Sequence, residues 1–553
     1  MQLSHICCSS CHKVGHKKNS KKCENYQNPS ISYSVTAALY QSIGLDLNVQ
    51  KCFCISRKNV KLIINSLEVP YIDYTSTSFC FLGCYLGSAE KTLDSLENYL
   101  NSIKKELEVI KTLELEKHLK FFLLKICYAG KITHLLRSLP PSLTYNFCRQ
   151  FNKIRTQCLA YLMSVDPSIL KNHIFSDVQL GGVGFNSSKY LTKAAFIGGG
   201  KNFVFEFSRR YPFAENLLEN TNSLFLDNLR EEISSLSPDL WQSCFPISIQ
   251  EITDRSLYSL KFALQKLQRH LLKNFENKDF IVRLSTAKKE NPAFANFLID
   301  LKDSSSAVLI NQIPQIYGLF LNDDQWTTAM RMRCYLWPCN LPNDLFCKCG
   351  AGLTLSHLFN CNRYISYRST LHDAVRDQIH AMCNSYHIES FVEPLLRSLD
   401  INESVRDSEY GKRRADVVVP SGCMQEKCLE KCSIRSIPLD DSELYKRKKY
   451  ANPLKELKHV RHVDYQICPF AISLYGRFGK TALNFIDDFE NLVKKRMNKR
   501  FDRRLWLNRI VFTIFKSIPK MISKALMSVS AHYEYIAAVR FDGVEACFED
   551  IDF

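Results

Sequence analysis

Three cysteines and one histidine within fifteen residues constrain this chain more than any other feature of its sequence. The stretch reads C-K-C-G-A-G-L-T-L-S-H-L-F-N-C and contains Cys347, Cys349, His357 and Cys361. Three thiolates and one imidazole form the ligand set of a closed tetrahedral zinc site. Such an ion stabilises a segment that is too short to form its own core. Cys334 and Cys339, shortly before the cluster, are alternative ligands.

A group of charged residues follows about fifty positions later. In G-K-R-R-A-D-V-V-V-P, Asp416 ends a basic run and begins an apolar, β-branched segment typical of a strand. Glu430, with Glu426 as its rival, lies in a second expected strand, and K-R-K-K-Y supplies Lys446 and Lys449. Two carboxylates can hold Mg²⁺, the ion activates water, and a lysine stabilises charge on phosphate. The pattern favours a metal-dependent phosphodiesterase.

Simpler interpretations of the same residues stay open. Asp416 could be a surface carboxylate at the end of a strand, paired with Arg413 or Arg414. The lysines around Lys446 could belong to a solvated basic helix.

The length and the net charge of the chain are consistent with a protein of several domains that binds a polyanion. The chain has 553 residues, of which 46% are hydrophobic and 23% charged, and this is an ordinary globular composition. Its 73 Lys and Arg against 56 Asp and Glu give a net charge of +17. Positive surface attracts DNA or RNA most simply. A basic protein without a nucleic-acid partner is the alternative.

The cysteine content and the N-terminal sequence bear on the compartment. The 23 cysteines are diluted over a long chain, and the N-terminus lacks the apolar stretch of a signal peptide. No uncharged apolar run approaches the eighteen residues of a membrane span. We therefore expect reduced thiols, no membrane partner and a nuclear location, or a cytoplasmic one before import.

Most of the chain before the cluster has a helical pattern. We expect a helix that ends at Gly44 and a strand or hairpin over residues 79–88. Residues 90–165 have helical periodicity, and one helical run within them stops at Pro140-Pro141. The glycines of residues 181–184 predict a tight turn with positive φ, followed by a helix. Residues 200–330 are expected to be mostly helical.

Two of these segments resemble the end of the reverse transcriptase palm in non-LTR (LINE-type) retrotransposons. They read G-L-D-L-N-V-Q-K and F-L-G-C-Y-L-G, and Lys51 occupies a position of the family's motif. The later G-G-V-G and A-A-F-I-G resemble the signature that follows the thumb in that family. The resemblance implies a helical thumb over residues 90–200 that grips a primer–template duplex through its phosphates.

The C-terminal region resembles the restriction-like endonuclease of site-specific members of the same family. There a CCHC zinc knuckle precedes a histidine element, matched here by His372, and then a PD-(D/E)xK fold. Asp416 matches the first catalytic aspartate, Glu430 the second carboxylate, and Lys446 and Lys449 the lysine region. C-P-F-A-I-S-L-Y-G-R-F-G resembles the family's strand–turn–helix. Ala415 replaces the family's proline, and Leu371 replaces an arginine.

The polymerase metal site of the family has no counterpart in this sequence. Nothing before Gly44 supplies the aspartate strand and the Y-x-D-D hairpin that hold two metal ions. Phe485-Ile486-Asp487-Asp488 mimics the hairpin, but its context has helical periodicity. We therefore expect the C-terminal portion of a larger polyprotein, without polymerase activity.

Together these observations predict a mixed α/β multidomain protein with a mostly helical thumb and linker, a small zinc knuckle and an α/β restriction-like endonuclease. Its expected domains are a basic leader (1–31), the end of a palm (32–89), a thumb (90–200), a linker (201–330), the zinc region (331–380), the nuclease (381–490) and basic C-terminal helices (491–553). We expect the leader to be disordered. The alternative is a zinc knuckle formed by Cys8, Cys11, His16 and Cys23.

The resemblance implies that the protein nicks target DNA with Mg²⁺ for target-primed reverse transcription and also binds the element's RNA. A non-catalytic nucleic-acid-binding remnant, or a zinc-stabilised interaction protein, is the alternative. Nucleic acid would contact six basic residues: Lys51, Arg413, Arg414, Lys494, Lys495 and Arg496.

Overall fold

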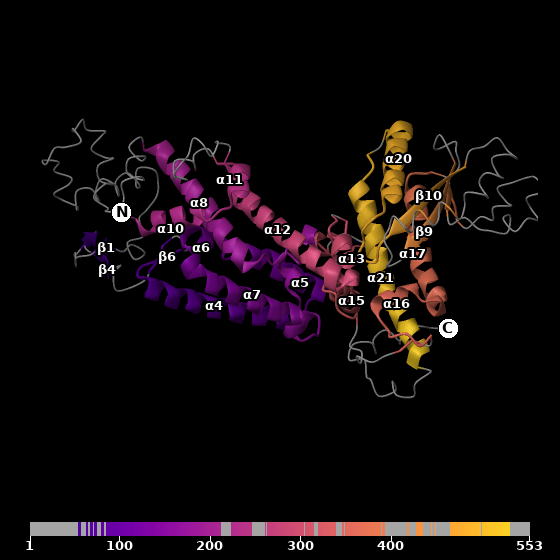
Figure 1. Ribbon diagram of the computed structural model, residues 1–553, viewed down its shortest axis with the longest axis horizontal. Coiled ribbons are helices and arrows are strands. Elements are labelled where there is room, and N and C mark those ends of the chain that lie inside the picture. Colours follow the sequence, from indigo (N-terminus) through magenta and orange to yellow (C-terminus); the bar gives the residue numbers. More distant parts are fainter. Residues whose placement is uncertain are drawn as a thin grey trace, which may run out of the picture. The chain divides into compact units, whose positions relative to one another are not determined.

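The structure is a computed structural model, and it describes the following parts of the chain: residues 54–56, 62–64, 67–69, 71–73, 79–81, 84–211, 223–245, 260, 263–303, 305–314, 319–338, 346–347, 349–388, 390–392, 417–419, 427–434, 444, 448, 465–498 and 500–530. These residues are mostly helical, with few strands, as expected for the thumb and linker (Figure 1). The chain divides into two compact units, Met1–Ser102 and Ile103–Phe553.

The first unit contains short paired strands. β1 (Cys54–Ser56) pairs in parallel with β4 (Tyr71–Asp73), and β2 (Leu62–Ile64) pairs antiparallel with β3 (Leu67–Val69). β5 (Phe79–Phe81) and β6 (Cys84–Leu86) form an antiparallel hairpin. This hairpin confirms the prediction for residues 79–88. The helix expected before Gly44, and Lys51, lie outside the described residues.

Helices then follow one another as their apolar periodicity predicts. Their bounds are α4 Ala89–Thr112, α5 Lys117–Ala129, α6 Thr133–Ser138, α7 Pro141–Leu162, α8 Ser188–Arg210, α10 Leu224–Ser234, α11 Pro238–Cys244, α12 Leu267–Glu290, α13 Pro292–Leu301, α14 Val308–Asn311 and α15 Asp323–Arg333. α6 ends before Pro140, as predicted, and Pro141 begins α7, where its missing N–H has no cost. Residues 200–330 are mostly helical, as expected.

The glycine turn between α7 and α8 has the predicted backbone. Gly181 and Gly184 have φ values of +87° and +85°, a region that L-residues with a Cβ disfavour. Gly182 is required for a different reason, because a Cβ there would lie 1.8 Å from the carbonyl oxygen of Ser176. The turn therefore fits closely against the chain that precedes it.

The helices α8, α10, α11 and α12 share one apolar core. Trp241 and Phe245 stack with ring centroids 4.2 Å apart, and Phe196 packs edge-on against Phe225. Burial of such aromatic side chains is a large favourable contribution to folding. This core accounts for the helical character of the expected linker.

The C-terminal region combines helices with a four-stranded sheet. α16 (Leu355–Asn360) and α17 (Ile365–Ser385) precede the sheet, and α20 (Lys480–Met497) and α21 (Arg503–Ser530) follow it. The strand order is β10 (Tyr465–Ile472), β9 (Lys427–Ile434), β8 (Val417–Val419) and β7 (Phe391–Val392). β9 and β10 are parallel, whereas the other pairs are antiparallel. α20 packs on β10, and α17 packs along α21.

Two predictions for this region are confirmed. β10, a turn with Gly476 at φ +87°, and α20 form the expected strand–turn–helix. Phe485 and Ile486 are buried in α20, so Phe485-Ile486-Asp487-Asp488 is helical and not a polymerase hairpin. The aromatic side chains of α21 at Trp506, Phe512 and Phe515 are buried in the core.

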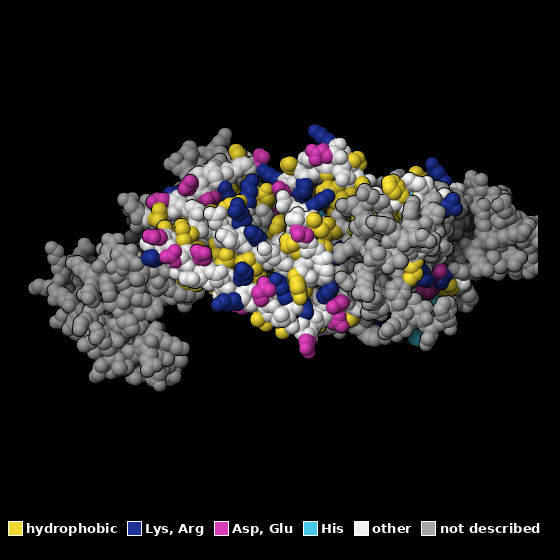
Figure 2. All heavy atoms as spheres, turned by 90° about the horizontal axis from the view of Figure 1, so that it is seen from below, with side chains coloured by type: hydrophobic (Ala, Val, Ile, Leu, Met, Phe, Trp, Pro, Cys, Tyr) yellow, Lys and Arg dark blue, Asp and Glu magenta, His cyan; other side chains and the backbone are white. Residues whose placement is uncertain are grey.

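Two further features of the described residues concern their hydropathy and their surface charge. No described helix is both long and apolar enough to cross a membrane. On the face drawn in Figure 2, Lys and Arg side chains are interspersed with acidic and hydrophobic ones and do not form one block. On this face the positive charge is therefore distributed.

Candidate metal centre

The first two cysteines of the cluster lie in a tight turn. The backbone N–H of Cys347 donates to the carbonyl of Ala351, and that of Gly350 donates to the carbonyl of Cys347, both at 2.8 Å. Phe346 and Gly352 form an isolated antiparallel bridge around the turn. Gly350 has φ +85°, and a Cβ there would meet nothing within 4 Å, so its backbone conformation is what requires glycine. This turn directs two thiols to one place.

The other two ligands lie within and directly after the short helix α16. Thr354 is its N-cap, and the Thr354 hydroxyl accepts a hydrogen bond of 3.0 Å from the backbone N–H of His357. Cys361 is the C-cap, and its N–H donates to the carbonyl of His357 at 2.8 Å. The cap therefore holds the backbone of His357, and the end of α16 returns Cys361 to the turn.

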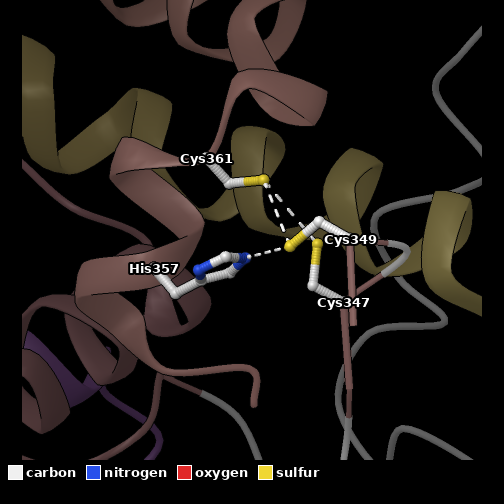
Figure 3. Close-up of side chains that lie close together, drawn as sticks. All are labelled: Cys347, Cys349, His357 and Cys361. Atoms are coloured by element: carbon white, nitrogen blue, oxygen red, sulfur yellow. Dashed lines mark hydrogen bonds between the residues drawn. The ribbon is translucent and has the colours of Figure 1, made fainter. Parts of the chain in front are cut away.

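The four ligand atoms lie within 4.8 Å of one another. Figure 3 shows the three sulfurs and the imidazole converging, with Sγ–Sγ distances of 3.7 Å for Cys347–Cys361 and 3.9 Å for Cys349–Cys361, and 3.3 Å from Cys349 Sγ to His357 Nε2. Tetrahedral zinc with Zn–S bonds of about 2.3 Å separates its sulfurs by roughly 3.8 Å, and sulfur from nitrogen by roughly 3.6 Å. The cluster therefore fits a zinc-like metal ion.

The surroundings of Cys347 favour its ionised form. Burial opposes ionisation of this thiol, but the nearby Tyr364 hydroxyl and Cys349 backbone favour the thiolate, outweigh the burial and lower its pKa to about 6. Tyr364 is itself 1% exposed. Metal ligands are commonly oriented by such neighbours. Cys349 is exposed, and His357 and Cys361 are half-buried, so the cluster lies at the surface.

His372, the residue that matches the family's histidine element, lies on the next helix beside two charged residues. On α17, Asp373 Oδ1 lies 3.2 Å from His372 Nδ1 and accepts a hydrogen bond from Arg376 at 3.1 Å. Arg376 also pairs with Asp377. Buried Leu371, by contrast, belongs to the core. The three polar residues therefore lie together, close in sequence to the cluster.

The candidate nuclease residues are described only in part. Glu430 lies in β9, where its backbone pairs with Val417, the residue that follows Asp416. The other candidates of this group, Asp416, Lys446, Lys449, Arg413, Arg414 and the rival Glu426, lie outside the described residues. Lys494, Lys495 and Arg496 form the exposed basic last turn of α20.

Cys334 does not join the cluster, so its interpretation as an alternative ligand is wrong. It is fully buried at the end of α15, and its sulfur lies 4.0 Å from that of Met163. Cys339, the second alternative, lies outside the described residues. α15 thus packs with the preceding helices, although residues 331–334 were assigned to the zinc region.

Sequence reasoning also missed two buried arginines of α15. Arg333 donates to the carbonyls of Ser306, Val178 and Gly182 at 2.7–3.3 Å. Arg331 donates to the carbonyls of Met163 and Ser164 at 2.8 and 2.7 Å. Both side chains therefore join α15 to backbone carbonyls of chain segments more than a hundred residues earlier.

Comparison with models of known protein families and with curated proteins finds no match to this chain. The function is therefore argued from the residues and the geometry described above.

Proposed function

We propose that Cys347, Cys349, His357 and Cys361 bind a structural zinc ion in a nucleic-acid-handling protein. The observation that supports this most is the convergence of four ligand atoms within 4.8 Å. Four protein ligands complete a tetrahedron and leave no position for water or substrate, which is the arrangement of structural zinc sites. The ion would fix the turn at Cys347 against α16 and the start of α17.

We propose further that the region after the zinc site is a Mg²⁺-dependent endonuclease of the restriction-like type. In support, β8 begins immediately after Asp416, and Glu430 lies on the adjacent strand β9. Mg²⁺ bound by two carboxylates would activate water for attack on a phosphodiester. Neighbouring strands bring two carboxylates together only if both face the same side of the sheet, so each position needs its own test.

Nucleic acid would be attracted to the basic residues of the same region. The net charge of +17 and the exposed last turn of α20 support this partner. DNA nicking at a target and binding of element RNA are the roles that the resemblance to retrotransposon proteins implies.

The test is the nicking of supercoiled plasmid by the full chain with Mg²⁺. Asp416→Asn and Glu430→Gln should each lower the rate at least about 100-fold, because each removes a ligand of the ion. Glu426→Gln is the matched control and should leave the rate unchanged. If Glu426→Gln abolishes nicking and Glu430→Gln does not, the second carboxylate is Glu426.

A second outcome separates cleavage from binding. Unaltered protein that binds the plasmid but does not nick it would overturn the nuclease proposal and favour a nucleic-acid-binding remnant. Binding that is absent, or unaffected by salt, would overturn both, since phosphate contacts weaken steeply as salt rises.

A further inference from the structure

The start of helix α8 has hydrogen-bond donors without acceptors. Its N-cap Ser187 makes no side-chain cap bond, although the helix is 23 residues long. The carbonyl of Ser187 accepts from the N–H groups of Tyr190 and Leu191. The N–H groups of Ser188 and Lys189 have no partner among the described residues. A helix end of this kind carries a partial positive charge and attracts anions.

A buried cation packs against the residues just before this helix end. Arg155 of α7 is 3% exposed, and its Nε and Nη2 have no hydrogen-bond partner among the described residues. Its guanidinium carbon lies 3.9 Å from the ring centroid of Phe185, two residues before the N-cap. Burial lowers the pKa of Arg155 to about 9, so the side chain is still charged at neutral pH. A buried charge without a counter-ion is costly.

The face of α7 that carries Arg155 is turned toward the start of α8. Cys148, Asn152 and Arg155 follow one another at helical spacing on α7. Asn152 donates to the carbonyl of Asn186 at 2.9 Å and to the hydroxyl of Ser188 at 3.0 Å. Burial raises the pKa of the Cys148 thiol to about 11, while Ser188 and Arg155, both close to it, act against this rise. Arg155 therefore faces the same helix end as Asn152.

The surface around the helix end is also suitable for an anion. Asn186, Ser187 and Ser188 are partly exposed, and Lys189 is exposed. Two acidic groups lie near Tyr190 in the first turn. Asp279 accepts from the Tyr190 hydroxyl and is paired with Arg283, and Glu276 is also close to Tyr190.

We propose that the N-terminus of α8, with Arg155 behind it, binds a phosphate group. The N–H groups of Ser188 and Lys189 donate to its oxygens, the Lys189 ammonium contacts it from the solvent side, and Arg155 supplies the buried positive charge. The phosphate is either free or part of a nucleic-acid backbone. The assignment to a nucleic-acid backbone rests on the proposed function, whereas the phosphate site itself does not.

The test exchanges the phosphate for a side-chain carboxylate at the same place. Ser187→Asp supplies a good N-cap and puts a negative charge on the donors, whereas Ser187→Asn is an equally good but neutral cap. Both variants should fold at least as well as the unaltered chain. The thermal midpoint of the full chain is measured with inorganic phosphate against sodium chloride at equal ionic strength.

We expect phosphate to raise the midpoint of the unaltered chain and of Ser187→Asn. For Ser187→Asp, and for Arg155→Met, the phosphate affinity derived from the shift should fall about tenfold, because one adds repulsion and the other removes attraction. A response equal in the Asp and Asn variants, or absent from the unaltered chain, would overturn the site. These readouts need neither Mg²⁺ nor cleavage, so they do not depend on the nuclease proposal.

Binding of a single-stranded oligonucleotide at several salt concentrations identifies the source of the phosphate. If it belongs to nucleic acid, the slope of log affinity against log salt should be smaller by about 1 for Ser187→Asp than for Ser187→Asn. Equal slopes, with the response to inorganic phosphate still lost, assign the site to free phosphate.

Discussion

Two neighbouring parts of the chain stabilise irregular backbone by opposite means. At the end of α15, the buried guanidinium of Arg333 donates to three backbone carbonyls, those of Ser306, Val178 and Gly182. Fourteen residues later, the sulfur of Cys347 begins a cluster of four electron-pair donors. The first group has its positive charge built into a side chain. The second has only ligands, and it needs an ion to supply the charge.

This difference determines when each part can be ordered. Burial lowers the pKa of Arg333 to about 10, so its charge is present at every pH near neutral. The three sulfurs and the imidazole lie within 4.8 Å of one another, but their mutual contacts contribute little stability. When the cysteines are ionised, their thiolates repel one another. The helical region is therefore expected to fold by itself, whereas the cluster is expected to fold only with its metal.

The largest expected effect follows from removing the metal. Structural zinc contributes on the order of 10 kcal/mol to the segments that it organises. A chelator, or His357→Ala, should remove about one zinc per chain, measured by metal analysis. Hydrogen exchange should then show lost protection at residues 346–364 and unchanged protection in α12. Equal loss of protection at residues 346–364 and in α12 would contradict the expectation that only the cluster folds with the metal.

The next effect concerns Arg333. Arg333→Met keeps most of the apolar side chain but removes the hydrogen bonds to the carbonyls of Ser306, Val178 and Gly182. We expect a loss of about 3–5 kcal/mol in the free energy of unfolding, measured with urea. Arg149→Met on the exposed face of α7 is the matched control and should change it by less than about 0.5 kcal/mol. Similar values for the two variants would refute the role of the buried guanidinium.

The same comparison shows what the sequence could predict. The cluster ligands are close in sequence, and both the cap at Thr354 and the glycine at position 350 are local signals, so spacing alone indicated the site. The partners of Arg331 lie 167 and 168 residues away, and those of Arg333 as far as 155. No local pattern distinguishes such a buried arginine from a surface one.

Helices and turns were predictable for the same reason. Apolar periodicity located most helices, and the glycines near 181–184 indicated positive φ, because both depend on neighbours in the chain. The packing of α5 against α21 was not predictable. It brings His118 onto the ring of Phe512, with centroids 6.2 Å apart, across nearly four hundred residues of sequence.

That contact gives a pH-dependent prediction for the helical region. His118 is fully buried, neither ring nitrogen has a hydrogen-bond partner among the residues that the structure describes, and burial lowers its pKa to about 4. In the unfolded state the His118 imidazole has a pKa near 6.5, so it binds a proton at a higher pH than it does in the folded state. The contribution of His118 to the free energy of unfolding is therefore complete above about pH 6.5 and is lost as the pH falls toward 4. The loss should reach about 3 kcal/mol.

His118→Phe is the variant that checks this effect. It should reduce the dependence of the urea midpoint on pH between about 6.5 and 4 relative to the unaltered chain, and the remainder is expected from buried His173, whose pKa burial lowers to about 3. Exposed His387→Phe is the control and should leave the dependence as it was. If His118→Phe retains the full dependence, another group binds the proton.

The smallest expected effect lies in the metal-dependent part. Thr354→Ala removes the hydroxyl that accepts from the backbone N–H of His357 at 3.0 Å. Loss of an N-cap costs about 1 kcal/mol, which corresponds to roughly a fivefold weaker zinc affinity if α16 forms only with the metal. Competition with a chromogenic chelator measures this affinity. Thr354→Ser keeps the hydroxyl and should restore it. If α16 is already formed without zinc, the alanine variant loses stability but not affinity, so this small change distinguishes a preformed site from one that the ion folds.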